Sequence, residues 1–192
     1  NETAGLFSFG DPAAPELLVR VEPDGDGFRA LYSALGPLAE RRFTLSIADA
    51  ATGEVRRFDE TPRRCAQEGQ TGDALVALVG EKARKPAAGT CVARADTLCL
   101  LGRRLAVQVD WSGGKGVATS LGRLAGLFAL ADRNRPELAV RAEETPEGVR
   151  LSYAALSDEG FTLTVTDTLA GGARTTFEAA PGQACGGPRG DR

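Results

Sequence analysis

An all-β fold is predicted by three features of the sequence: short runs of alternating apolar and polar residues, turn-forming clusters between those runs, and a segment that occurs twice. Alternation with a period of two places successive side chains on opposite faces of a strand and is typical of half-buried antiparallel sheets. Clusters rich in Gly, Pro and Asp separate the runs, as turns separate strands. Together these features predict antiparallel sheets along the whole chain.

The duplicated segment begins with Gly5-Leu6-Phe7, which recurs as Gly126-Leu127-Phe128, and each copy ends on a cysteine, Cys65 or Cys185. The matches between these ends are Pro15–Arg20 with Pro136–Arg141, Tyr32 and Leu35 with Tyr153 and Leu156, and Phe43–Asp49 with Phe161–Asp167. The second copy follows an alternating stretch from Leu98 to Trp111, and nothing ahead of Gly5 corresponds to it. A unit without its opening strands has an unpaired sheet edge or takes a strand from elsewhere.

In the first copy, the alternation predicts strands over Leu17–Glu22, Phe28–Tyr32 and Phe43–Ala48. Turns are predicted at Pro23–Gly27 and at Thr52-Gly53. A polar stretch then leads to the apolar run Ala74–Val79, which fits either a short helix capped by Asp73 or a fully buried strand. We favour the strand, because it would help to fill the gap in the first copy.

The second copy is predicted to hold six or seven strands, the number found in a β-sandwich. The predicted strands are Leu98–Leu100, Leu105–Trp111, Gly126–Phe128, Leu138–Val140, Val149–Tyr153 and Phe161–Thr166. The fold class is therefore all-β, with two tandem immunoglobulin-like β-sandwich units of which the first lacks its opening strands. We expect the first, incomplete unit over residues 1–65, a linker with a possible donated strand over 66–90, the second unit over 91–185 and a flexible tail over 186–192.

Composition excludes several classes of function. The chain contains no histidine, which rules out Ser-His-Asp triads and histidine-ligated zinc. Its net charge of −3 supplies no basic field for nucleic acid, and no stretch reaches the roughly 20 apolar residues of a membrane span. The absence of methionine, with Asn1 as first residue, predicts a mature protein that has lost a signal peptide. We expect an extracellular or cell-surface protein that is not an enzyme.

The four cysteines suit an oxidising compartment and are the disulfide candidates: Cys65, Cys91, Cys99 and Cys185. One pairing joins Cys91 to Cys99 and Cys65 to Cys185. Another joins Cys65 to Cys91 and Cys99 to Cys185, and reduced thiols are a further alternative. We favour the first pairing, because it closes a small loop and ties the ends of the two copies.

The remaining candidate sites are acidic turns and one aromatic residue. Asp24 and Asp26 lie in a glycine-rich turn, and Glu143, Glu144 and Glu147 lie at the matching place in the second copy. Such oxygens suit calcium, but the spacing is not that of an EF-hand, so we expect no metal and no cofactor. Trp111 continues the inward face of Leu105, Val107 and Val109, which favours a place in the core over a sugar-binding platform.

The second copy resembles a β-sandwich module of secreted, uncharacterised bacterial proteins. The resemblance is carried by Thr97–Leu100, Val107–Trp111, Gly126–Phe128, Pro136–Arg141 and Phe161–Thr168, in that order. It covers Cys91 to Cys185 well and Thr3 to Cys65 in part, and it departs at Leu127, Ala129 and Leu130, where more aromatic residues are usual. The resemblance implies the fold and an extracellular setting, with no active site.

We therefore predict a non-catalytic extracellular structural protein that self-associates into a homo-oligomer or polymer, as a fibre or surface-filament subunit joined by strand donation. The candidate donors are Ala74–Val79, Thr97–Trp111 and either terminal tail. The alternative is an adhesin or carbohydrate-binding module of a larger secreted protein, with a glycan or cell-surface ligand.

Overall fold

The computed structural model describes residues 4–24, 27–35, 38, 41–60, 89–146, 148–157 and 159–181. Within these residues it confirms the all-β prediction: every regular element is a strand, and all pairings are antiparallel. Cys65, Ala74–Val79, Cys185 and the tail lie outside the described residues.

We call β1–β5 the first half and β6–β14 the second half. The strands of the first half are β1 (Ala4–Phe7), β2 (Leu17–Asp24), β3 (Gly27–Ala34), β4 (Phe43–Ala48) and β5 (Val55–Glu60). Those of the second half are β6 (Leu98–Leu100), β7 (Leu105–Trp111), β8 (Gly114–Lys115), β9 (Val117–Ser120), β10 (Ala125–Ala129), β11 (Pro136–Thr145), β12 (Gly148–Ala155), β13 (Phe161–Asp167) and β14 (Ala173–Ala179).

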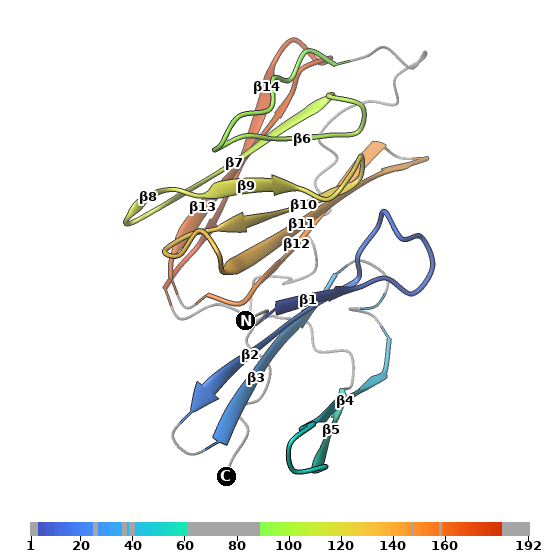
Figure 1. The fold of residues 1–192 in the computed structure, drawn as a ribbon. Helices are drawn as coiled ribbons and strands as arrows, with labels where there is room; N and C mark the ends of the chain where they lie inside the picture. Colours follow the sequence, from blue (N-terminus) through green and yellow to red (C-terminus); the bar gives the residue numbers. More distant parts are fainter. Residues whose placement is uncertain are drawn as a thin grey trace.

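The strands form four layers, which Figure 1 shows stacked from top to bottom. The uppermost sheet has the order β14-β13-β7-β6, with β8 paired to β7, and the next has the order β12-β11-β10-β9. Below them lie the sheet β1-β2-β3 and the hairpin β4-β5. No helix in the described part of the chain has the length and apolar character to span a membrane.

The two upper layers enclose the largest apolar core. Strand β7 shows why the sequence folds this way: Leu105, Val107 and Val109 are buried, while the residues between them are partly exposed. Phe128 of β10 and Leu98 of β6 fill the centre of this core, and the partly buried Trp111 packs against its rim. The predicted packing role of Trp111 is confirmed.

The two halves share the same strand register where the sequence repeats. Gly5 lies opposite Val19 in the β1–β2 pair, as Gly126 lies opposite Val140 in the β10–β11 pair. In the next strands, Val19 faces Tyr32 and Val140 faces Tyr153. The duplicated sequence thus forms the same three-stranded unit twice, as β1-β2-β3 and as β12-β11-β10.

The expectation of half-buried strands is wrong for the central strand of each unit. In β2 the four consecutive residues Leu17–Arg20 are all buried, and in β11 burial is continuous from Glu137 to Ala142. The reason is that the sheets β1-β2-β3 and β12-β11-β10-β9 lie against each other, so each has both faces covered (Figure 1). The alternating pattern in β2 separates two apolar environments instead of protein from water.

A disulfide joins Cys91 to Cys99, with their Cα atoms 5.8 Å apart. It fastens the segment ahead of β6 to that strand, where the Nε of Arg103 donates a hydrogen bond to the carbonyl of Cys91 at 2.7 Å. This confirms one bond of the favoured pairing, and the other two cysteines lie outside the described residues.

Replacement of the repeated glycine by alanine is expected to affect the two halves differently. A Cβ at Gly126 would overlap the side chain of Leu98 and lie 2.8 Å from the carbonyl oxygen of Thr119, so Gly126→Ala should cost about 1–3 kcal/mol through overpacking. A Cβ at Gly5 would meet only the ring of Phe7, at 3.7 Å, so Gly5→Ala is the matched control and should be nearly neutral. Urea denaturation of both variants checks this, and equal losses of stability would contradict it.

Candidate functional site

The first candidate interaction surface lies between the two facing sheets, which we call the inner faces. Its apolar centre combines three leucines of the first half with two alanines and a leucine of the second. These buried residues are Leu18, Leu31, Leu35, Ala139, Ala154 and Leu156, with Leu6 and Leu127 at the margin. Leu35 and Leu156 occupy matching positions, because the amide of each donates to the carbonyl of the matching glutamate at 2.7 Å. Each half therefore contributes a leucine that is held in the same way by the backbone of the matching glutamate.

Charged residues cross the inner faces in a reciprocal pattern. Arg20 of β2 lies 3.8 Å from Glu137, and Arg141 of β11 lies 3.4 Å from Glu16. Arg20 and Arg141 hold matching places, since each faces the first residue of the neighbouring strand, Ala4 or Ala125. Each arginine thus reaches the glutamate that lies four residues before the matching arginine of the other half, as expected for an approximate two-fold relation between the halves.

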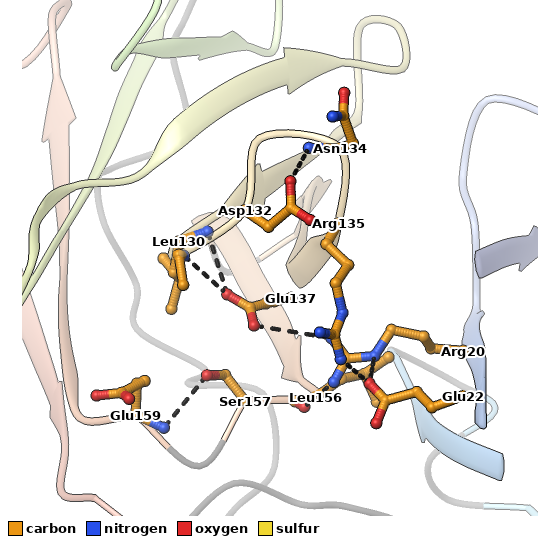
Figure 2. A network of polar contacts seen from close by, with 11 residues as sticks. Arg20, Glu22, Leu130, Asp132, Asn134, Arg135, Glu137, Leu156, Ser157 and Glu159 are labelled. Carbon is orange, nitrogen blue, oxygen red and sulfur yellow. Dashed lines mark hydrogen bonds and ion pairs between the residues drawn. The ribbon is translucent and has the colours of Figure 1, made fainter. Parts of the chain in front are cut away.

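Arg20 is the most enclosed charge at this contact, with 4% of its surface exposed. Its Nη2 donates a hydrogen bond to the carbonyl of Leu156 at 3.1 Å, and its Nε lies 2.7 Å from Glu22, which also pairs with Arg135 (Figure 2). Burial lowers the pKa of Arg20 from its ordinary value, and the carboxylates of Glu22 and Glu137 act against that shift. The ion pairs therefore compensate a charge that the fold removes from water.

Glu137 links this network to the backbone of the second half. Its Oε2 accepts hydrogen bonds from the amides of Leu130, at 3.2 Å, and Ala131, at 3.3 Å, while its Oε1 faces Arg20 (Figure 2). A carboxylate held in this way by a turn is already positioned for the arginine of the facing sheet.

The second candidate surface is the outer edge of β4. By sequence, β4 corresponds to β13, which pairs with β14 on one side and with β7 on the other. Strand β4 pairs with β5, the counterpart of β14, and no described strand lies on its other side. Within the described residues, β4 is thus an edge strand, whereas its counterpart β13 is a central strand of its sheet.

The aromatic residue of the duplicated Gly-Leu-Phe segment shows the same difference. Phe128 is 0% exposed inside the main core, whereas Phe7 is 48% exposed. Phe7 lies on the face of its sheet that also carries Leu17 and Val19, the face towards the hairpin β4-β5. The apolar core between this face and the hairpin includes Leu45 of β4, with Phe43 and Ile47 of that strand only partly buried. It is smaller and more open than its counterpart in the second half.

The acidic residues singled out in the sequence are engaged in ion pairs where the structure describes them. Glu143 lies 3.0 Å from Arg141 and 3.8 Å from Arg150, and Glu144 lies 4.0 Å from Arg123. The side chain of Asp24 and all of Asp26 and Glu147 lie outside the described residues. Among the described residues, no group of three or more acidic or cysteine side chains is arranged to hold a metal ion.

The sequence reasoning did not single out Glu16, Arg20, Glu137 and Arg141 as interaction residues. The signal was present, because both copies place a glutamate and an arginine four residues apart in the matched segments that begin at Pro15 and Pro136. An arginine on the apolar face of a strand, at the same place in both copies, indicates a buried partner of opposite charge.

No protein-family model, no curated protein and no solved structure matches this chain.

Proposed function

We propose that the protein is a non-catalytic extracellular structural protein that self-associates, with a strand from a neighbouring copy added to the outer edge of β4. The observation that carries the proposal is the different pairing of two strands with matching sequences. Strand β13 is paired on both sides, whereas β4 has only β5 among the described residues. In this reading the halves are two tandem immunoglobulin-like sandwiches, and the first is completed by the added strand.

The backbone of β4 presents hydrogen-bonding groups on the side where no described strand lies. The amide of Asp49 donates to the carbonyl of Glu54 at 2.9 Å, towards β5. Because an antiparallel ladder alternates, the amides of Ser46 and Ala48 point away from β5. In the second half, the amide of Thr168 donates in the corresponding outward direction, to the carbonyl of Arg104 at 2.8 Å. A strand added to β4 would satisfy groups that β7 satisfies in β13.

The partly exposed side chains of Phe7, Phe43 and Ile47 also support the addition of a strand beside β4, because that strand would cover them. An added strand beside β4 would bring further side chains towards Phe7, as β7 does for Phe128. Apolar burial and main-chain hydrogen bonds together are the usual basis of strand addition. A contact of this kind repeated head to tail does not close, and it builds a filament.

The choice of donor is narrower than the sequence allowed. Thr97–Trp111 contains β6 and β7, which are paired within the second half. This segment would have to leave its own core before it could be donated. The other candidates, Ala74–Val79 and the two tails, lie outside the described residues.

An extracellular location is supported by the Cys91–Cys99 disulfide, because such bonds form and persist in oxidising compartments.

The proposal predicts that a proline on the edge of β4 abolishes self-association. Ser46→Pro removes an outward amide and leaves the ladder to β5 in place, since proline is tolerated where a strand amide is not used. Ser46→Ala, which keeps the amide, is the matched control. Light scattering after size-exclusion chromatography should show large species for the wild type and for Ser46→Ala, and only monomer for Ser46→Pro. A wild-type protein that stays monomeric, or a Ser46→Pro variant that still polymerises, would refute strand addition at this edge.

A carbohydrate-binding module is the second candidate function, favoured by one observation. Phe9 is 62% exposed just beyond β1, close in sequence to the exposed Phe7. Exposed aromatic rings provide flat apolar surfaces with an electron-rich face, which suit ligand recognition. Binding on a glycan array that disappears in Phe9→Ala would support this function over the structural one.

A further inference from the structure

The reciprocal charges between the inner faces have a consequence for partners. In a two-fold interface, a residue of one side meets a given residue of the other, and the same pair occurs a second time with the sides exchanged. Arg20 with Glu137 and Arg141 with Glu16 form such a pair of pairs. Each half therefore carries both members of the pair, a glutamate and an arginine, at matching places.

A surface that carries both members is complementary to a copy of itself. If two first halves met face to face in the same geometry, Arg20 of each would meet Glu16 of the other. The apolar centre would then consist of Leu18, Leu31 and Leu35 from both copies, a larger apolar area than the leucine-on-alanine contact within one chain.

We propose that the inner face of the first half is a self-recognising docking surface, whose partner is the same face of a second copy of this chain. The contact uses a sheet face, so it is independent of strand addition at the edge of β4. In the wild-type chain the second half occupies this face, and its alanines accommodate the leucines of the first. The covalent connection also gives that half a high effective concentration, so a second copy docks only when the contact within the chain is weakened.

The charges allow a test that opens the contact within the chain and preserves the contact between copies. The double reversal Glu16→Arg with Arg20→Glu places like charges opposite Arg141 and Glu137. Two copies of the reversed face remain complementary, since the arginine introduced at position 16 of one copy meets the glutamate introduced at position 20 of the other. The control adds Glu137→Arg and Arg141→Glu, which restores opposite charges within one chain. The new glutamate at position 20 lies next to Glu22 in both proteins, so that repulsion cancels in the comparison.

All variants are made in the full chain with Ser46→Pro, which blocks the edge of β4, and their masses are measured by light scattering at several concentrations. The double reversal is expected to have at least twice the mass of the four-fold control, and the control should match Ser46→Pro alone.

A double reversal that stays monomeric, or unfolds at every concentration while the control folds, would overturn the proposal. Association of a folded control would also overturn it, because the pairing would then not be reciprocal. The control also loses the hydrogen bonds that Glu137 accepts from Leu130 and Ala131, and it places a glutamate at position 141 beside Glu143. The reversal in the second half alone carries the same losses, so the proposal requires the control to be the more stable of these two variants. The reversal in the second half alone, Glu137→Arg with Arg141→Glu, should also associate through the freed first half. If it does not, the proposal is likewise rejected.

Discussion

Truncation of Phe128 to alanine is expected to lower the free energy of unfolding by about 3–5 kcal/mol, the usual range for a phenylalanine removed from a core. Phe128 is fully buried between the two upper sheets, among residues such as Leu98 and Leu138. The cavity would lie beside β10, which is paired with β9 and with β11 and is therefore little able to collapse. Urea denaturation of the wild type and of Phe128→Ala measures this loss, provided that the free energy of unfolding depends on urea concentration with the same slope in both proteins.

Phe7→Ala is the control, because Phe7 occupies the same position of the duplicated segment and is about half exposed. In dilute, monomeric protein its loss of stability should be a small fraction of that of Phe128→Ala. In the associated state the loss should grow, because the proposed added strand covers this ring. Equal effects of the two truncations in the monomer would contradict the inference that the first half has a more open core.

Replacement of Asp167 by asparagine is expected to cost about 3–5 kcal/mol, as for a buried ion pair that loses one partner. The Oδ2 of Asp167 accepts hydrogen bonds from Nε and Nη2 of Arg104, at 3.0 and 2.7 Å, and both residues are buried. An amide in this position would remove the negative charge that faces the buried guanidinium of Arg104. The Oδ1 atom, which accepts from the amide of Leu169 at 3.0 Å, would be kept, so the turn itself should survive.

Asp49→Asn is the matched control for this replacement. Asp49 directly follows β4, at the place that matches Asp167 at the end of β13, and its Oδ1 accepts from the amide of Ala51 at 2.8 Å. That hydrogen bond lowers the pKa of the Asp49 carboxyl, and no buried arginine is paired with it among the described residues. Thermal unfolding should shift strongly for Asp167→Asn and little for Asp49→Asn. A small shift for Asp167→Asn would contradict a stabilising role of its charge beside Arg104.

The strands and their order could be predicted from the sequence because alternation is a local signal. Leu105–Trp111 and Phe161–Thr166 appear in the structure with nearly the predicted ends, as β7 and β13. The short strands β8 and β9 were not predicted, since Gly114–Lys115 and Val117–Ser120 carry little apolar pattern. They are strands because β7 and β10 provide backbone partners for them.

The candidate site was less accessible to sequence reasoning, because burial depends on what covers each face. Arg20 and Arg141 interrupt apolar strand segments, so each is expected to be exposed to solvent when its copy is considered alone. Their burial follows from the contact between sheets distant in sequence, which no local pattern encodes. An unpaired edge in the first copy was expected from the comparison of the two copies, since only one of them follows a segment like Leu98–Trp111. Among the described residues, β4 is such an edge, because only β5 pairs with it.

The layer β12-β11-β10-β9 belongs to two cores at once: Leu138 and Val140 point to one, and Ala139 points to the other. A fragment cut at the boundary of the duplication would expose Leu127, Ala139 and Leu156 to water as one apolar patch. Expression trials that separate the halves should therefore yield an aggregation-prone, poorly soluble second half. The stability of the two copies is therefore coupled, because a substitution in β11 can disturb the packing of both cores.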